Sequence, residues 1–107
     1  MSEAPQLSEP TPQEIGTMSG KVLLEFGATW CGYCQAAQPL IAEALAGVEG
    51  VRHLRIEDGK GRRLGRHYRV KLWPTLVLLV EGQEIARRGR PQDVGEIRTL
   101  LSVARPG

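Results

Sequence analysis

Trp30-Cys31-Gly32-Tyr33-Cys34 contains the only two cysteines of the 107-residue chain, separated by two residues. An apolar run, Val22 to Phe26, precedes this stretch, and a segment with helical periodicity, Gln35 to Ala46, follows it. The pattern predicts a strand, a short turn and a helix that begins at the first cysteine. In a cytosolic chain, two thiols at this spacing indicate redox or metal chemistry more than a structural disulfide framework.

Composition is typical of one globular domain. Hydrophobic residues make up 41% of the chain and charged residues 24%, and the formal net charge of +2 is too small to indicate a polyanionic partner. No apolar run approaches the roughly 20 residues that span a bilayer. The polar, acidic N-terminus lacks the pattern of a secretory signal. We therefore expect a cytoplasmic protein without membrane contact; a secreted form whose signal peptide was removed is the alternative.

The remaining segments predict an α/β fold. Residues 1–12 hold three prolines among polar residues and predict a flexible lead-in to one domain over residues 13–107. Thr11 and Pro12 are typical of the start of a short helix. After the cysteine helix we expect a strand over 51–56, a basic helix over 62–68, strands over 76–80 and 83–88, and a helix over 92–104. This order predicts a central mixed β-sheet flanked by helices on both faces.

At these positions the sequence resembles the thioredoxin family, from about Val22 to the last helix. The residues that carry the resemblance are the Trp-Cys-Gly-x-Cys turn, Pro39 five residues after the second cysteine, the Pro74-Thr75 pair, Gly82 and Gly89. The resemblance implies the thioredoxin fold, with a cis peptide bond before Pro74 that lies against an active-site disulfide.

The cysteines are candidate catalytic residues. At a helix start, the thiol of Cys31 would face unpaired backbone N–H groups, which stabilise a nucleophilic thiolate. Cys34, one turn further, would resolve the mixed disulfide by attacking Cys31. A zinc half-site or a pair of packing cysteines are the alternatives. The only histidines, His53 and His67, are 14 residues apart, so we expect no metal and no cofactor beyond a redox-active Cys31–Cys34 disulfide.

Glu25 is the third candidate catalytic residue. It lies within the apolar run, where the resemblance places a buried acid that is usually Asp. Burial is expected to raise the pKa of this carboxyl, which could then take the proton from Cys34 directly or through water. His53 falls where thioredoxins often carry a lysine beside that acid, which suggests a Glu25–His53 pair. The alternatives are a glutamate that reaches solvent or pairs with another cation, and a plain surface histidine.

A substrate groove is expected around the cysteines, framed by Trp30, Gly32, Tyr33, Trp73, Pro74, Thr75 and Gly89. The two tryptophans would form an apolar rim, with the backbone of Trp73 free to pair with an extended substrate; core packing is the alternative for either one. Thioredoxins favour a small aliphatic residue before the cis-proline, so Trp73 suggests a different substrate range.

Basic residues gather in residues 60–71 and 87–90. We interpret them as solvated faces. A nucleic-acid patch would need interleaved aromatic residues and a larger excess of positive charge. A cationic flank that steers acidic partners is an intermediate interpretation.

The sequence thus predicts a monomeric protein-disulfide reductase that binds no nucleic acid. Its substrates would be protein disulfides. Its electrons would come from a thioredoxin-reductase-type donor, since the chain has no nucleotide-binding glycine motif. A disulfide oxidase or isomerase is one alternative, and a thioredoxin-fold binding module with little catalysis is the other.

Tyr33 generates a prediction about the redox potential. It replaces the proline typical of thioredoxins, and the resulting Cys-Gly-Tyr-Cys is similar to the site of bacterial periplasmic disulfide isomerases. The change should loosen the turn and alter the stability of the thiolate, and about 30 mV corresponds to roughly 1.4 kcal/mol. We predict a potential less reducing than the roughly −270 mV of thioredoxin. Equilibration with glutathione measures it, and a value at or below that figure contradicts the prediction.

Overall fold

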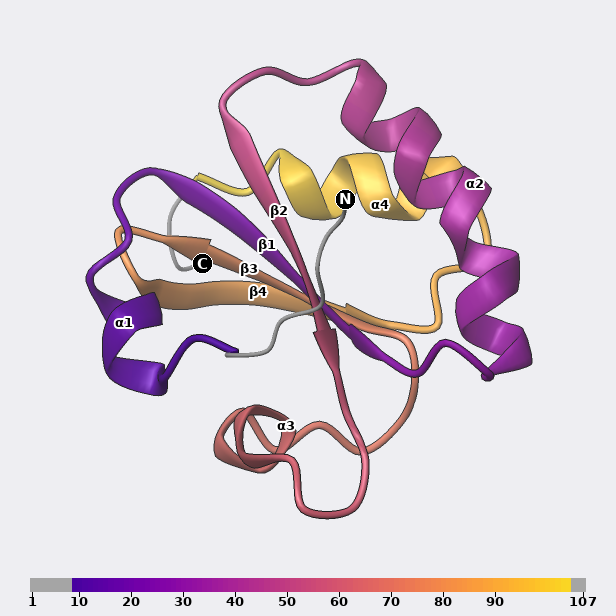
Figure 1. Ribbon diagram of the computed structural model, residues 1–107. Coiled ribbons are helices and arrows are strands. Elements are labelled where there is room, and N and C mark those ends of the chain that lie inside the picture. The colour runs from indigo at the N-terminus through magenta and orange to yellow at the C-terminus, as the bar shows by residue number, and fades with distance from the viewer. Residues whose placement is uncertain (1–8, 105–107) are drawn as a thin grey trace, which may run out of the picture.

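Four strands form one mixed sheet in the computed structural model, which describes residues 9–104 (Figure 1). They are β1 (Lys21–Gly27), β2 (Val51–Glu57), β3 (Thr75–Val80) and β4 (Gln83–Gly89), in the order β2-β1-β3-β4. Strand β1 pairs parallel to β2 and antiparallel to β3, and β4 pairs antiparallel to β3. The predicted fold class is confirmed. Most of the predicted lead-in, residues 1–8, lies outside the described residues.

Helices cover both faces of this sheet. They are α1 (Pro12–Gly16), α2 (Gly32–Ala46), α3 (Arg63–His67) and α4 (Val94–Leu101). The last helix is shorter than predicted at both ends. Asp93 caps its start, where the carboxylate accepts a hydrogen bond from the backbone N–H of Glu96 at 2.9 Å, and Ser102 is its C-cap. None of the helices among these residues is long and apolar enough to cross a membrane.

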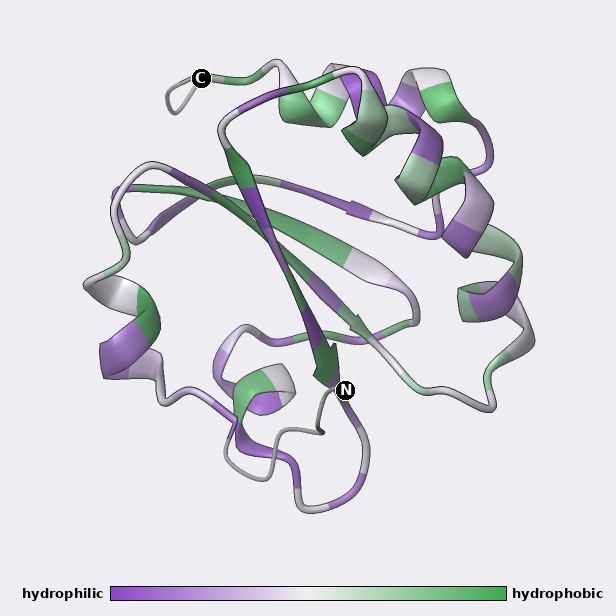
Figure 2. Ribbon diagram, turned by 45° about the horizontal axis from the view of Figure 1, so that its top comes forward, coloured by the Kyte–Doolittle hydropathy of each residue, from purple (hydrophilic) through white to green (hydrophobic). Residues whose placement is uncertain are grey.

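Alternation along β1 divides the core into two layers. Leu23 faces α2 and α4, where it packs with Ile41 and Ile97. Val22, Leu24 and Phe26 point to the opposite face, toward α1 and α3. Figure 2 shows the hydrophobic strand β3 in the middle of the sheet and alternating hydropathy along the edge strand β2. Because Glu25 shares the face of Leu23, its carboxyl enters the layer beneath α2.

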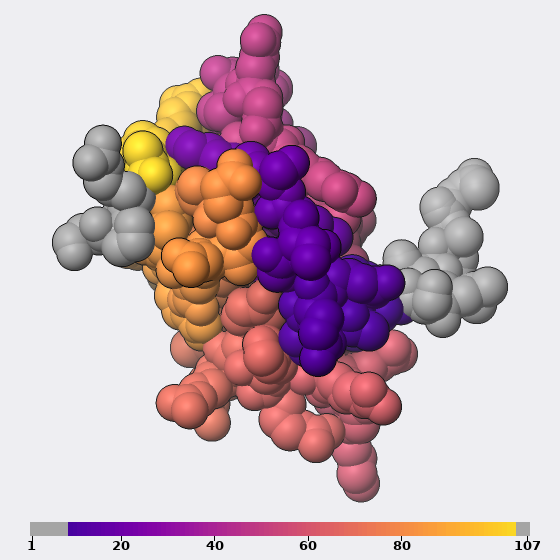
Figure 3. All heavy atoms as spheres, turned by 90° about the vertical axis from the view of Figure 1, so that its left-hand side faces the viewer, coloured from indigo at the N-terminus to yellow at the C-terminus, as the bar shows by residue number. Residues whose placement is uncertain are grey.

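The turn between β3 and β4 is fastened to the N-terminal part of the fold. The backbone N–H of Glu81 donates to the carbonyl of Gly20 at 3.0 Å, and its carboxylate accepts from the N–H of Gly20 at 2.9 Å. Gly82, with a φ of +80°, lies against the backbone of Gly16 with no room for a Cβ. Figure 3 shows α1 in indigo beside this orange hairpin.

The register brings two connections to one end of the sheet. Phe26, near the end of β1, pairs with Thr75 at the start of β3. The turn that follows β1 carries the cysteines, and the segment before β3 carries the cis Trp73–Pro74 peptide bond. The antiparallel pairing of β1 with β3 therefore places these two loops at the same end of the sheet.

Candidate active site

The cysteine turn ends in a helix cap made by sulfur. Cys31 is the N-cap of α2, with an extended backbone, and its Sγ accepts a hydrogen bond from the backbone N–H of Cys34 at 3.2 Å. The predicted helix start at the first cysteine is confirmed. Both cysteines are free thiols, 7% and 5% exposed. The thiol of Cys31 thus stands where a helix favours negative charge.

The surroundings of the two thiols shift their pKa values in opposite directions. Burial opposes ionisation of Cys31, but hydrogen bonds from the Cys34 thiol and from the N–H groups of Cys34 and Tyr33 outweigh it. Together with the charge of Arg90, they lower the pKa of Cys31. Burial, the neighbouring Cys31 and the charge of Glu25 raise the pKa of Cys34 to about 11. Cys31 therefore ionises more readily than Cys34 and is the better nucleophile of the two.

Gly27, which the sequence analysis did not single out, makes room for the second thiol. A Cβ at this position would lie 2.6 Å from the Sγ of Cys34. The end of β1 must therefore be glycine for α2 to approach it this closely. The sequence contains no signal for this requirement apart from the glycine itself.

Glu25 lies beneath α2 and has three polar neighbours. Its carboxylate is 2.7 Å from His53 Nε2, accepts from Gln38 Nε2 at 2.5 Å and lies 3.8 Å from Arg55 Nε. The predicted Glu25–His53 pair is confirmed, and the residue is only 4% exposed. Gln38 also donates to the carbonyl of Cys34 at 3.1 Å, so it connects the acid to the cysteine helix.

The prediction that Glu25 has a raised pKa is wrong. Burial does act in that direction, but hydrogen bonds from His53 and Gln38 outweigh it. The nearby charge of Arg55 adds to them, and the pKa of Glu25 is lowered. The carboxyl is therefore ionised at neutral pH, despite its burial.

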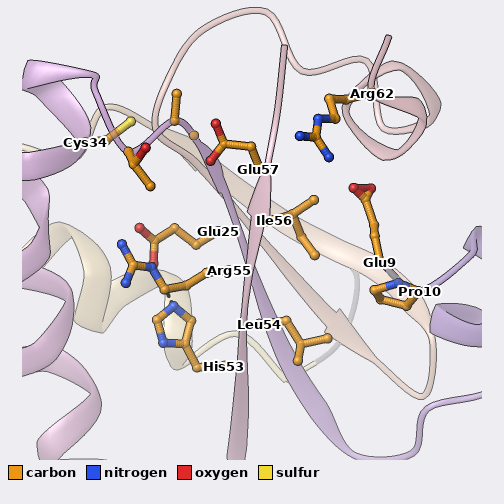
Figure 4. Close-up of a pocket in the computed structure, with 13 residues that line it drawn as sticks. Glu9, Pro10, Glu25, Cys34, His53, Leu54, Arg55, Ile56, Glu57 and Arg62 are labelled. Carbon is orange, nitrogen blue, oxygen red and sulfur yellow. Dashed lines mark hydrogen bonds and ion pairs between the residues drawn. The ribbon is translucent and has the colours of Figure 1, made fainter. Parts of the chain in front are cut away.

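A cavity of about 850 Å³ opens beside β2 and reaches the inner part of the site. Glu25, Cys34, His53 and Glu57 are among the residues that line it (Figure 4). Polar and apolar side chains both line it, and it is large enough to hold water. His53, at the outer end of the Glu25 pair, has a quarter of its side chain exposed. The buried acid is thus connected to solvent through a titratable side chain.

The two tryptophans lie beside the thiols. Trp73 is half-buried against the cysteines, and its ring centroid is 5.4 Å from that of Trp30, edge to face. Trp30 is 71% exposed, so core packing does not describe it. Asp58 fixes the second indole, because its Oδ2 accepts a hydrogen bond from Trp73 Nε1 at 2.8 Å. The two rings form an apolar edge next to Cys31.

The other predicted groove residues also gather at this end of the sheet. Gly32 begins α2 and has open space at its Cα. Tyr33 is 61% exposed. Pro74 and Thr75 are buried, and the Thr75 hydroxyl donates to the carbonyl of Leu72 at 2.6 Å. Gly89 pairs with Thr75 across the sheet and contacts the side chain of Leu72.

Arg90 belongs to the site, although its sequence context predicts a solvated charge. Its Nε donates to the carbonyl of Trp73 at 2.8 Å, and its guanidinium lies 4.0 Å from the centroid of the Tyr33 ring. Its backbone N–H donates to the carbonyl of Pro74 at 2.8 Å. The expectation that the Trp73 backbone is free is therefore wrong for its carbonyl. No sequence pattern marks Arg90 apart from its position after Gly89.

Across the described range, 9–104, no group of three or more His, Cys, Asp and Glu residues is placed to hold a metal ion. The polar groups around the cysteines instead shift the pKa values of the two thiols in opposite directions. This fold and this pair of thiols define a thiol–disulfide oxidoreductase.

Comparison with known proteins gives the family. The sequence model of the Thioredoxin family matches residues 9–102. The reduced structure of thioredoxin 2 from Pseudomonas aeruginosa PAO1 is 46% identical, with a TM-score of 0.82 over 94% of each chain. Thioredoxin Asp f 28 of Aspergillus fumigatus is 32% identical over 85 residues, 79% of each chain. Thioredoxin of Chlamydia trachomatis serovar D is 32% identical over 84 residues, 78% of this chain and 82% of the relative. The chain belongs to the thioredoxin family and is a protein-disulfide reductase of that family.

The opposite pKa shifts predict selective alkylation. At pH 7, iodoacetamide should modify Cys31 and leave Cys34 unmodified, because a thiol with a pKa of about 11 is ionised in only about one molecule in ten thousand. The rate at Cys31 should rise with pH through a midpoint below that of an unperturbed thiol. Peptide mass spectrometry identifies the labelled residue. Cys31→Ser is the control and should stay unlabelled; modification of Cys34 first contradicts the assignment.

Proposed function

We propose that this protein reduces protein disulfides in two exchange steps, with Cys31 as the nucleophile and Cys34 as the resolving thiol. The observation that carries this assignment is the hydrogen bond from the Cys34 N–H to the Cys31 sulfur, with the opposite pKa shifts of the two thiols. Cys31, whose pKa is lowered, attacks the substrate, and Cys34 stays protonated until the second step.

In the first step the Cys31 thiolate attacks one sulfur of the substrate disulfide. The substrate S–S bond breaks, and its other sulfur leaves as a thiolate that takes a proton from solvent. A mixed disulfide joins Cys31 to the substrate. The rim of Trp30 and Trp73 supports the substrate chain beside this bond. Gly32 offers no side chain to obstruct it.

In the second step Cys34 attacks the Sγ of Cys31. The mixed disulfide breaks, the second substrate sulfur is released as a thiolate, and a Cys31–Cys34 disulfide forms. Two electrons have then passed from the protein to the substrate. A reductase of the thioredoxin-reductase type would return two electrons to the Cys31–Cys34 disulfide. That disulfide is the only redox group in the proposed reaction.

Glu25 accepts the proton of Cys34 in the second step, directly or through water in the cavity beside β2. Its lowered pKa keeps it in the basic form at neutral pH. His53, 2.7 Å away and partly exposed, then carries the proton to solvent. This pair replaces the buried acid and lysine that the resemblance implies.

The same chemistry can run in reverse. A lowered pKa at Cys31 stabilises the reduced form and makes the couple more oxidising, which favours oxidase or isomerase activity as the second candidate. We infer a monomer acting in the cytoplasm on protein partners, without nucleic acid or membrane. In that compartment, exchange runs toward substrate reduction.

Reduction of insulin by dithiothreitol tests the assignment. The wild-type protein should accelerate it, and Cys31→Ser should fall to the uncatalysed rate. Incubated with insulin without dithiothreitol, Cys34→Ser should form the mixed disulfide but fail to resolve it, so that a covalent adduct at Cys31 accumulates in a non-reducing gel. Comparable slow rates for wild type and Cys31→Ser would instead favour a binding module. An adduct at Cys34 in Cys31→Ser would reverse the two roles.

Replacement of Glu25 tests the proton route. In Glu25→Gln, resolution at pH 7 should slow at least tenfold, since only water remains to take the proton. The deficit should shrink as the pH rises above 9, because hydroxide then serves and the pKa of Cys34 falls without the nearby charge. Decay of the mixed disulfide, followed by acid quench and mass spectrometry, gives the rate.

Glu57→Gln is the matched control, since Glu57 lines the same cavity and carries the same charge. It should keep the wild-type pH profile. An unchanged profile in Glu25→Gln rules out the proton role. Circular dichroism establishes that both variants are folded.

A further inference from the structure

A second cavity, of about 440 Å³, has Trp73 in its lining but neither cysteine. Arg62, Arg66, Lys71 and Arg90 line it together with Asp58 and the indole of Trp73. We call it the α3 pocket, because Arg66 comes from α3 and Arg62 is the N-cap of that helix. Four cations and one acid give it a strong positive potential.

The positive charge of the α3 pocket is not neutralised from within the described part of the chain. The five ion pairs among these residues involve His53, Arg55, Arg87, Arg88 and Arg98, and none of the pocket cations. Asp58 is already committed, since it accepts from Trp73 Nε1 and lies over Gly65, where a Cβ would not fit. The pocket therefore offers cationic donors that a carboxylate could accept from.

Two residues, Trp73 and Arg90, belong both to the lining of the α3 pocket and to the surroundings of the cysteines. Trp73 packs against the cysteines while it also lines the pocket. Arg90 spans the same boundary, because it lines the pocket, binds the Trp73 carbonyl and covers Tyr33. An extended chain advances about 3.3–3.6 Å per residue, so a substrate joined to Cys31 crosses one indole within about two to four residues.

We propose that the α3 pocket binds an Asp or Glu side chain of the substrate, two to four residues from the substrate's reacting cysteine. Its preferred substrates are then protein disulfides with an acidic flank. This specificity rests on the proposed function, since it requires the substrate to be attached at Cys31. The carboxylate ion-pairs with Arg66 and Lys71, which are exposed, while the indole of Trp73 supports the intervening backbone.

Two disulfide peptides that differ only in Glu or Gln three residues from the cysteine test this proposal. Wild type should reduce the Glu peptide about threefold to tenfold faster, in kcat/KM, at low ionic strength. The ratio should approach one in 0.5 M NaCl, because salt screens exposed charges. Equal rates at low ionic strength overturn the pocket assignment.

Arg66→Gln/Lys71→Gln should lower the Glu-to-Gln ratio toward one, with the rate on the Gln peptide unchanged. The matched control is Arg52→Gln/Arg98→Gln, which removes the same net charge from exposed positions outside the pocket. It should keep the wild-type ratio. Equal loss in both double variants overturns the proposal, because only overall charge would then matter.

Charge reversal gives an outcome that a folding defect cannot imitate. Arg66→Glu/Lys71→Glu should reverse the preference and favour a peptide with Lys at the same position. A retained preference for Glu contradicts the proposal. The Gln peptide distinguishes failure of the pocket assignment from failure of the proposed function. If this peptide is reduced only when Cys31 is present, the proposed function holds whatever the flanking preference. If Cys31→Ser reduces it as well, the proposed function fails.

Discussion

The cap of α2 is the interaction on which the site depends. A helix start leaves backbone N–H groups without partners, and here a thiol sulfur accepts from one of them. Cys31 therefore completes a structural element and at the same time gains a lowered pKa. The approach of α2 to the end of β1 requires Gly27, and the same approach buries Cys34 and raises its pKa. One helix position thus creates the difference between two identical side chains.

Electrostatics around the disulfide site are uneven. On the β2 side, Glu25 is ionised and lies beneath the resolving thiol. On the α3 side, the cations of the α3 pocket line it together with Trp73. The attacking sulfur therefore borders positive charge and the waiting sulfur borders negative charge. The charge of Arg90 lowers the cost of a thiolate at Cys31, and the charge of Glu25 increases the cost of one at Cys34.

Sequence patterns predicted the features that depend on neighbours along the chain. The apolar run at β1, the helix that begins at Cys31 and the Thr11 cap of α1 follow from local spacing. The Glu25–His53 pair followed from the resemblance. The direction of the pKa shift of Glu25 was not predicted, because it depends on how far the hydrogen bonds from His53 and from Gln38, which arrives from α2, outweigh burial.

Arg90 and the helix ends escaped prediction for related reasons. Arg90 occupies a connection with a φ of +47°, and its contacts with Trp73 and Tyr33 join segments that lie far from it in sequence. Hydrophobic periodicity carries no information about such contacts. The ends of a helix likewise depend on its caps, and α4 begins after Asp93 and ends before Ser102, where the apolar pattern alone suggested a longer element.

The placement of the indoles has an optical consequence. The chain has two tryptophans, Trp30 and Trp73, and both lie at the thiols with their rings 5.4 Å apart. The core aromatic residues are Phe26 and Tyr68. Under excitation selective for indole, all of the protein's emission therefore originates at the edge of the active site. Its intrinsic fluorescence is a local reporter of the dithiol and of any chain resting on it, and the core contributes no background.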